Sequence, residues 1–541
     1  MPRSSLTAPF KSFDFRLLWS AVLVSNLGGL IQAVGAGWMM ATISKSDDMV
    51  ALVQSATTLP IMLFSLASGA FADSFDRRRV MLAAQALMLV ISAALAIFAV
   101  TGQMTPWLLL TFTFLIGCGT ALHNPSWQAS MGDIVPREDI PSAVTLNSMG
   151  FNLMRSIGPA IGGLVVAAAG AATAFAFNAV SYIPLIVALL RWKHQREPSK
   201  LPREAFGHAV SAGLRYVAMS PNLITVISRS FLFGLSAVAI LALLPLVARD
   251  IIRGGAVTYG LLLGSFGIGA IGGALMNTRV REAFSNEVIA RFAFLGFAVS
   301  AALVAMSRDL WLTCLCLLPA GACWVLALSL FNVMIQLSTP RWVVGRSLSI
   351  YQTATFGGMA AGGWLWGVVA DAHDATNALL VSAAVLLAGA LIGLRFPLPG
   401  FLALNLDPLN RFKEPALRLD LRSRSGPIMV MVDYDIAQED VPAFLEAMTE
   451  RRRIRIRDGA RQWTLLRDLE NPGTWTEAYH VPTWVEYIRH NQRRTQSDAQ
   501  ISERLLALHR GDDPPRVHRM VERQTVPVRD DMPIKQNPEV P

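Results

Sequence analysis

Charged residues are scarce in this chain. Asp, Glu, Lys and Arg make up 16% of its 541 residues, whereas hydrophobic residues make up 53%. A globular chain that is so apolar is hard to keep in water. The composition therefore excludes an ordinary soluble protein and predicts one that crosses a lipid bilayer several times.

Cysteine is also scarce, and the positions of the four cysteines do not suit metal binding. All four cysteines fall inside apolar runs, and their spacing does not match a zinc site. We expect them to be small packing residues, with no metal and no cofactor. A Walker loop, Gly-x-x-x-x-Gly-Lys-Ser/Thr, is absent from the sequence, which argues against ATP-driven transport. The cysteines are Cys118, Cys314, Cys316 and Cys323.

The positive charge has a specific distribution. The chain has 47 Lys and Arg against 38 Asp and Glu, a formal net charge of +9. Such an excess can indicate nucleic-acid binding, but many arginines here stand in short loops between apolar runs, as orientation in a membrane requires. We therefore expect a lipid bilayer as the surrounding medium and no nucleic-acid partner.

Apolar windows of about 20 residues, the length that crosses a bilayer, recur along the chain. We predict twelve spans. Lys and Arg concentrate in the loops after spans 2, 6, 8 and 10, so these loops and both termini are expected in the cytoplasm of a bacterial cell, with the spans in its cytoplasmic (inner) membrane. The spans lie near 17–42, 50–72, 80–100, 107–131, 142–169, 172–190, 222–247, 258–277, 287–306, 310–336, 346–370 and 376–395.

An internal repeat divides these spans into two halves. A shift of about 204 positions pairs Gly69 with Gly273 and Arg77 with Arg281, and it also pairs further glycines of the two halves. The expected organisation is an N-terminal six-helix half (1–190), a cytoplasmic linker (191–221), a C-terminal six-helix half (222–395), a second linker (396–425), a soluble domain (426–525) and a disordered tail (526–541).

The loop between spans 2 and 3 carries a recognisable motif. Its residues Gly69, Asp73 and Arg77-Arg78-Arg79 resemble the signature loop of the major facilitator superfamily of transporters. The resemblance implies that Gly69 lets helix 2 pack against helix 11, and that Asp73 and Arg77 latch the cytoplasmic side of the outward-facing state. The alternative is a turn that orients the helices and has no gating role.

Span 5 contains the pattern Gly158-Pro159-x-x-Gly162-Gly163. Small residues permit close helix packing, and proline kinks a helix. The pattern is similar to the span 5 motif of the proton-driven drug exporters in the same superfamily, and it therefore favours export.

Arg155 lies about 14 residues into span 5, roughly 20 Å deep at 1.5 Å per residue. A charge at that depth is costly and indicates function. We consider two roles: a contact to an anionic or hydrogen-bonding substrate, together with Asn147 and Asn152, and a packing arginine bonded to carbonyls of a neighbouring helix.

Energy coupling has few candidate residues, because no Asp or Glu lies at the centre of a span. His123 in span 4 could titrate near neutral pH. Asp133 ends that span, and Asp371 closes span 11. Protons are the expected coupling ion, although a packed, hydrogen-bonded His123 is an equally good interpretation.

The run from Asn124 to Ser130, followed by Asp133, Asn147 and Arg155, resembles the subfamily of the bacterial enterobactin exporter and related transmembrane secretion effectors. The resemblance covers about residues 10–400. It implies a secondary-active transporter that exports a small amphipathic or anionic molecule, a siderophore or a drug, by alternating access. A lysolipid flippase and a membrane-tethered enzyme are the alternatives, and we expect no enzymatic activity.

The tail after residue 426 has its own periodicity. It predicts strands over 427–436, 462–468, 475–481 and 516–522, with helices over 439–453, 483–492 and 497–509. This order is ferredoxin-like. Through Trp463, Trp475, Glu477, Tyr479 and Trp484 the tail resembles the α+β-barrel domains of antibiotic-biosynthesis monooxygenases, which implies dimerisation through the tail. The aromatic residues either line a small pocket or form the domain's core.

Overall fold

The computed structural model describes residues 7–74, 76–136, 139–192, 206–340, 342–398, 409, 412, 414–422, 424–510 and 513–522. The chain divides into two compact units. The helical unit comprises residues 1–203, 224–335 and 348–401, and the C-terminal unit comprises 204–223, 336–347 and 402–541. The tail predicted to be disordered, 526–541, lies outside the described residues.

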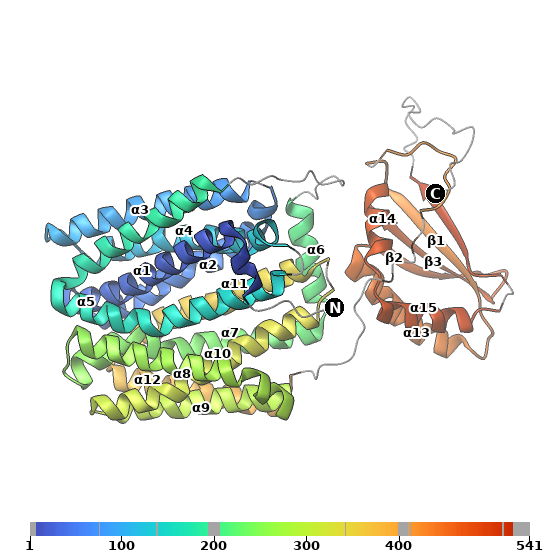
Figure 1. Ribbon diagram of the computed structural model, residues 1–541. Coiled ribbons are helices and arrows are strands. Elements are labelled where there is room, and N and C mark those ends of the chain that lie inside the picture. The colour runs from blue at the N-terminus through green and yellow to red at the C-terminus, as the bar shows by residue number, and fades with distance from the viewer. Residues whose placement is uncertain are drawn as a thin grey trace. The chain divides into compact units, whose positions relative to one another are not determined.

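Long apolar helices make up the helical unit (Figure 1). Polar residues define several of their ends: the Asp76 carboxylate accepts hydrogen bonds from the backbone of Arg78 and Arg79, and Asp374 caps the last helix in the same way. The helices are α1 Phe13–Ile43, α2 Asp47–Ser74, α3 Arg77–Val100, α4 Pro106–Ile134, α5 Ile140–Arg191, α7 Pro221–Leu246, α8 Ala256–Ala283, α9 Asn286–Met306, α10 Leu310–Leu337, α11 Val344–Ala372 and α12 Ala375–Arg395.

Ten helices within the described part of the chain are long and apolar enough to cross a membrane. Every predicted span overlaps one of the helices above. The predicted spans 142–169 and 172–190 both fall in α5, which is interrupted at Gly170. Gly170 has φ +81, a backbone conformation that glycine adopts without strain, so α5 consists of two helical arms.

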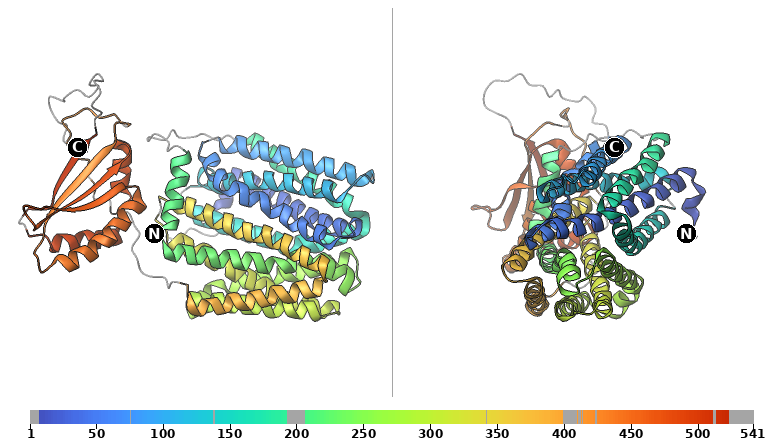
Figure 2. Two further views of the ribbon diagram at one scale, coloured as in Figure 1. Left: turned by 180° about the vertical axis from the view of Figure 1, so that it is seen from behind. Right: turned by 90° about the vertical axis from the view of Figure 1, so that its left-hand side faces the viewer.

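The helices run side by side in two groups, α1–α5 and α7–α12, seen along their length in Figure 1 and end-on in the right view of Figure 2. Within the first group α1 packs on α5, and α3 packs on α4 and α5. The two groups meet where α5 packs on α8. A Cβ atom added at Gly163 of α5 would lie 2.7 Å from the Gly260 Cα of α8, so the backbones are in direct contact there.

The C-terminal unit contains α6 Phe206–Ala218 and a four-stranded antiparallel sheet in the order β2-β3-β1-β4. The predicted order of elements is confirmed. The predicted end of the first tail helix is wrong: α13 continues beyond Arg453 through five more residues, because Gly459 (φ +124) is the first residue that stops it. The elements are β1 Ile428–Asp435, α13 Val441–Asp458, β2 Arg461–Arg467, β3 Thr474–Val481, α14 Trp484–Gln492, α15 Gln496–Ala507 and β4 Arg516–Val521.

Candidate substrate cavity

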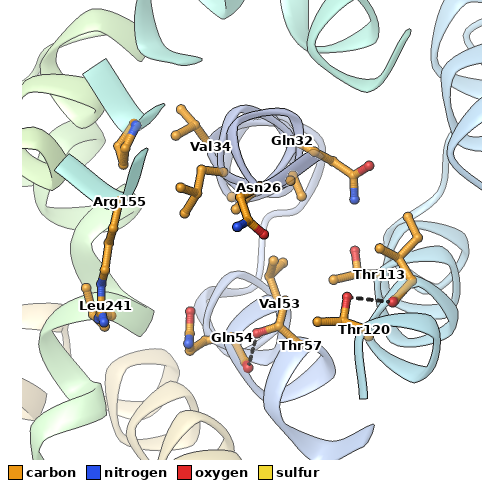
Figure 3. A pocket seen from close by; sticks show the side chains of 18 of the residues that line it. Asn26, Gln32, Val34, Val53, Gln54, Thr57, Thr113, Thr120, Arg155 and Leu241 are labelled. Carbon is orange, nitrogen blue, oxygen red and sulfur yellow. Dashed lines mark hydrogen bonds between the residues drawn. The ribbon is translucent and has the colours of Figure 1, made fainter. Parts of the chain in front are cut away.

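A cavity of about 430 Å³ opens between the two groups of helices in the helical unit. Its walls come from α1, α2, α3, α4, α5, α7 and α8, and the described lining residues include no Asp, Glu or Lys. Neutral polar side chains interrupt the apolar wall (Figure 3). Those of the first two helices are Ser25, Asn26, Gln32, Gln54 and Thr57.

Arg155 contributes a charge to this cavity. Figure 3 shows its side chain extending from α5 toward Leu241 of α7. The guanidinium carbon lies 5.9 Å from the centre of the Trp324 ring, a cation–π contact. Among the described residues Arg155 has no hydrogen bond and no ion pair. The structure therefore places a guanidinium in a cavity whose described lining residues include no carboxylate to neutralise it.

A buried network of polar side chains supports one wall. The Gln32 side-chain oxygen accepts hydrogen bonds from Ser92 at 2.9 Å and from the Asn178 amide at 2.5 Å. Asn178 also lies 3.0 Å from the hydroxyl of Tyr182, which lines the cavity. Our sequence analysis missed these residues, although a Gln and an Asn inside apolar spans were a usable signal.

His123 lies at the cavity, and Asn147 does not. His123 is buried and lines the cavity, and its Nδ1 has no hydrogen-bond partner among the described residues. The Asn147 side-chain oxygen instead accepts a hydrogen bond from the Trp127 indole at 3.0 Å. Asn147 therefore ties α5 to α4. The side chain of the other predicted asparagine, Asn152, lies outside the described residues.

The loop motif meets the end of α4. Arg77 forms an ion pair with Asp133 at 2.9 Å, and Arg78 donates hydrogen bonds to the carbonyls of Leu189 and Leu190 near the end of α5. Arg79 is exposed. Asp133, predicted as a coupling candidate, is thus engaged by the motif. The side chains of Gly69 and Asp73 lie outside the described residues.

Asp371 lies at the opposite end of the helical unit from that motif, because it pairs with the start of α2 and Arg77 follows its end. Its carboxylate accepts hydrogen bonds from the Ser46 hydroxyl at 2.9 Å and from the Asp47 backbone at 3.0 Å. Asp47 in turn pairs with Arg249 at 3.2 Å. These contacts join the α1–α2 loop to the second group of helices, so polar contacts close this end.

The glycines of span 5 lie where α5 touches its neighbours. Added Cβ atoms would come within 2.8 Å of Leu30 at Gly158 and within 3.1 Å of Ile31 at Gly162. Both contacts are with α1, whereas Gly163 faces α8. The motif therefore holds α5 between the two helices, and Pro159 lines the cavity beside Arg155.

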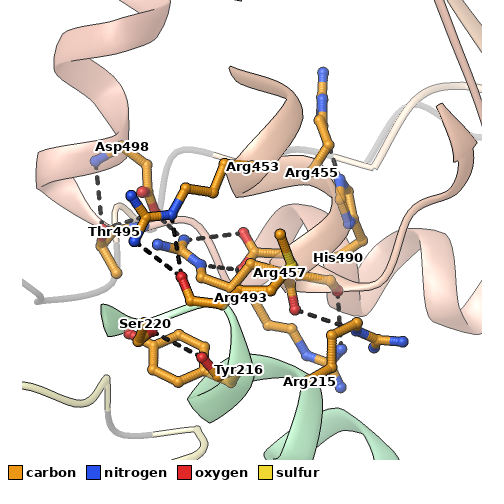
Figure 4. Close-up of polar contacts among 12 residues, drawn as sticks. Arg215, Tyr216, Ser220, Arg453, Arg455, Arg457, His490, Arg493, Thr495 and Asp498 are labelled. Carbon is orange, nitrogen blue, oxygen red and sulfur yellow. Dashed lines mark hydrogen bonds and ion pairs between the residues drawn. The ribbon is translucent and has the colours of Figure 1, made fainter. Parts of the chain in front are cut away.

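The C-terminal unit has a polar cluster between α13 and α6 (Figure 4). Arg457 pairs with Asp458 and with Asp498, each at 2.9 Å, and its guanidinium lies 5.4 Å from the Tyr216 ring. Arg453 donates two hydrogen bonds to the Met219 carbonyl. In the sequence, α6 connects the two groups of helices, so the domain holds this connector directly.

A sequence profile of the transmembrane secretion effector family matches residues 4–525. The chain is 24% identical over 267 residues to the staphyloferrin A transporter of Staphylococcus aureus, which covers 49% of this chain and 67% of that protein. It is 25% identical over 366 residues to the multidrug efflux pump Tap of Mycolicibacterium fortuitum, covering 66% and 89%.

Solved transporters share the fold. A bacterial homologue of the human lysosomal transporter Spinster, in an inward-facing and unoccupied conformation, superposes with a TM-score of 0.54 at 13% identity, covering 72% of this chain and 95% of that one. Profile, relatives and fold agree on a multi-pass membrane transporter. The chain belongs to the transmembrane secretion effector family of the major facilitator superfamily.

Proposed function

We propose that this protein exports a small organic anion, of the siderophore or drug class, by secondary-active alternating access. The observation that carries the proposal is the guanidinium of Arg155, which has no hydrogen bond or ion pair with the described residues and lies in a cavity whose described lining includes no carboxylate. A charged donor in such a site binds a carboxylate, catecholate or phosphate with a free energy of roughly 1.5–3 kcal/mol per charge-assisted contact. The relatives support the substrate class, since one carries staphyloferrin A and another pumps drugs.

The membrane arrangement completes this proposal. Twelve spans result if the two arms of α5 count separately and α11 is added to the apolar helices. With the even-numbered loops in the cytoplasm, the end closed by Asp371 and Arg249 is periplasmic. The described state is then one in which the cavity is sealed from the outside.

We assign proton coupling to His123, because its Nδ1 has no partner among the described residues and it shares the cavity with Arg155. In proteoliposomes His123→Gln should retain substrate exchange and lose accumulation driven by a pH gradient. Full gradient-driven accumulation by the variant would exclude His123 as the coupling group.

The C-terminal domain, in this proposal, is a ferredoxin-like module. The antiparallel order β2-β3-β1-β4, with one helix between β1 and β2 and two between β3 and β4, supports that description.

The decisive experiment is an export screen with siderophores, antibiotics and labelled lysolipids in cells that produce wild type, Arg155→Ala, Arg155→Lys or the exposed-site control Arg308→Ala. Loss of a charge-assisted contact should reduce export of anionic compounds by about tenfold or more in Arg155→Ala. Export by Arg155→Lys should lie between that of wild type and that of Arg155→Ala, because lysine keeps the charge but lacks the planar guanidinium group. Export by the control should match wild type.

Two outcomes would contradict the proposal. If both Arg155 variants only lower the protein level and leave export per molecule unchanged, Arg155 is a packing residue. Transfer of lysolipid in place of the soluble compounds would show a lipid flippase.

A further inference from the structure

The C-terminal domain contains a second cavity, of about 440 Å³, between its sheet and its helices. It lies within a single unit and is separate from the transport cavity. Its floor is formed by Val430, Val432 and Tyr434 of β1, and its walls come from α13, α14, α15 and β4. A small domain ordinarily fills such a space with apolar side chains.

Four arginines line this cavity, and none of its described lining residues is acidic. Arg455 is already neutralised: it donates to the buried Glu477 carboxylate at 3.0 and 3.4 Å and to His490 at 3.1 Å. Burial and the positive charge of Arg455 lower the pKa of His490 well below its usual value, so His490 stays neutral and adds no positive charge. Among the described residues, the Glu477 carboxylate forms ion pairs with two of the four guanidinium groups, those of Arg451 and Arg455. The four arginines are Arg451, Arg455, Arg494 and Arg519.

Arg494 is the cavity arginine whose positive charge is not paired with any described residue. Its guanidinium has no hydrogen bond or ion pair among the described residues. Burial and the repulsion of Arg455 and Arg451 lower its pKa to about 10, so the charge is retained at neutral pH. Arg451 is buried too, with its Nε atom unpaired by any hydrogen bond and 3.6 Å from Glu477. Arg451 also donates from Nη1 to the Ser502 hydroxyl at 2.9 Å, so Arg494 carries the uncompensated inner charge and Arg451 offers its remaining donors beside it.

Aromatic and apolar side chains form much of the remaining wall, together with the polar Asn491 and Ser502. The Arg455 guanidinium lies 4.4 Å from the centre of the Tyr479 ring, and Phe412 and Leu506 also line the cavity. Arg519 is exposed at the outer strand and is fixed by a 2.6 Å hydrogen bond from its Nε to the Tyr487 hydroxyl. The cavity thus combines an anion-binding interior with apolar surfaces and an arginine at an exposed position.

We infer that this cavity is a binding site for a small organic anion that carries an apolar ring, with the anionic group held by Arg494 and Arg451 and completed by Arg519. Unpaired buried positive charge destabilises a domain, whereas a bound anion removes that cost and stabilises the folded state. The cavity volume lies within the range of small-molecule sites, roughly 300–1,000 Å³.

The test uses the full-length protein and three probes: phenyl phosphate, which carries both an anionic group and a ring, inorganic phosphate, which has only the anionic group, and phenol, which has only the ring. Isothermal titration should show phenyl phosphate binding more tightly than either other probe. Arg494→Ala should weaken it by about tenfold or more. Arg519→Ala, at an exposed position that folding tolerates, should weaken it severalfold, and the matched control Arg516→Ala on the same strand should not.

Binding in the transport cavity is removed with Arg155→Ala, and the component of phenyl phosphate binding that depends on Arg494 and Arg519 should remain in this variant. Arg494→Ala should not lower the thermal midpoint of the ligand-free protein, because it removes a repelled charge. Absence of binding, equal binding of phenol, or unchanged binding in both Arg494→Ala and Arg519→Ala would overturn the site. Loss of binding in Arg155→Ala alone would place the anion in the helical unit instead.

Discussion

Glu477 is a buried anion of the C-terminal domain, and its removal tests how that domain is held together. The side chain is fully buried on β3 and accepts hydrogen bonds from Arg455 and from the Trp463 indole, both at 3.0 Å. Burial alone would raise the pKa of Glu477, but the attraction of Arg455 and Arg451 outweighs it and lowers the pKa to about 2 from the ordinary 4.5. At about 1.4 kcal/mol for each tenfold change in proton affinity, the ionised carboxylate stabilises the domain by on the order of 3 kcal/mol.

The direction of the pH dependence of stability follows from the lowered pKa of Glu477. The stabilisation is complete above the unfolded-state pKa and is lost as the pH falls from about 4.5 toward 2. Glu477→Gln should therefore destabilise the domain at pH 7 by about 3 kcal/mol, consistent with removal of one partner from a buried ion pair. The variant should also lose the extra acid sensitivity of the wild type.

Hydrogen exchange of β1 and β3 in the full-length protein measures this effect, because these strands are released when the domain opens. A change of about 3 kcal/mol corresponds to exchange on the order of a hundredfold faster. The control is Glu446→Gln, which removes the exposed pair with Arg504 and should change the rates by less than about threefold. Hydrogen-exchange rates in Glu477→Gln that match those of this control would refute the stabilising role of the ion pair between Glu477 and the arginines.

Three further results are expected. Arg77→Ala should lower export at an unchanged level of membrane-inserted protein, because its half-exposed ion pair affects conformation more than folding; normal export would exclude a latch. Gly163→Leu should abolish export or reduce folded protein, since a Cβ atom already meets the facing backbone at 2.7 Å, whereas Gly272→Leu, with open space around its Cβ, should have little effect; equal effects on purified yield would contradict the close contact. Arg457→Ala should speed hydrogen exchange in α6 without changing exchange in α1, and unchanged α6 rates would show that the polar cluster does not hold the connector.

The helices of the fold were predictable because each depends on local sequence. A long apolar run has few alternatives to a helix in a membrane, and only the kink at Gly170 joins two predicted spans into one element. The tail strands were found for the same reason, through their alternation. The predicted end of α13 at Arg453 is too early, because the following arginines and isoleucines continue the helix and Gly459 supplies the actual end.

The candidate site was only partly predictable, because it depends on contacts between distant residues. Depth in a span singled out Arg155, which lines the cavity. Asn147, equally polar and close in sequence, bonds to Trp127 instead, and no local pattern separates the two. The network of Gln32 and Asn178 joins residues 146 positions apart, and the cavity arginines come from α13, from β4 and from the segment between α14 and α15, so their common location emerges only from the fold.

Two opposite sides of helix α13 make different contacts. Arg451 and Arg455, one turn apart, face the anion cavity, while Arg453 and Arg457, displaced by two positions and so by more than half a turn, hold Met219 and Tyr216 of the connector. A helix of 18 residues resists bending over such a short distance, so its two sides cannot be displaced independently. An anion bound to Arg451 and Arg455 would therefore contact the same rigid helix whose opposite side holds Tyr216 and Met219 of the connector, so the binding site and the connector share one structural element.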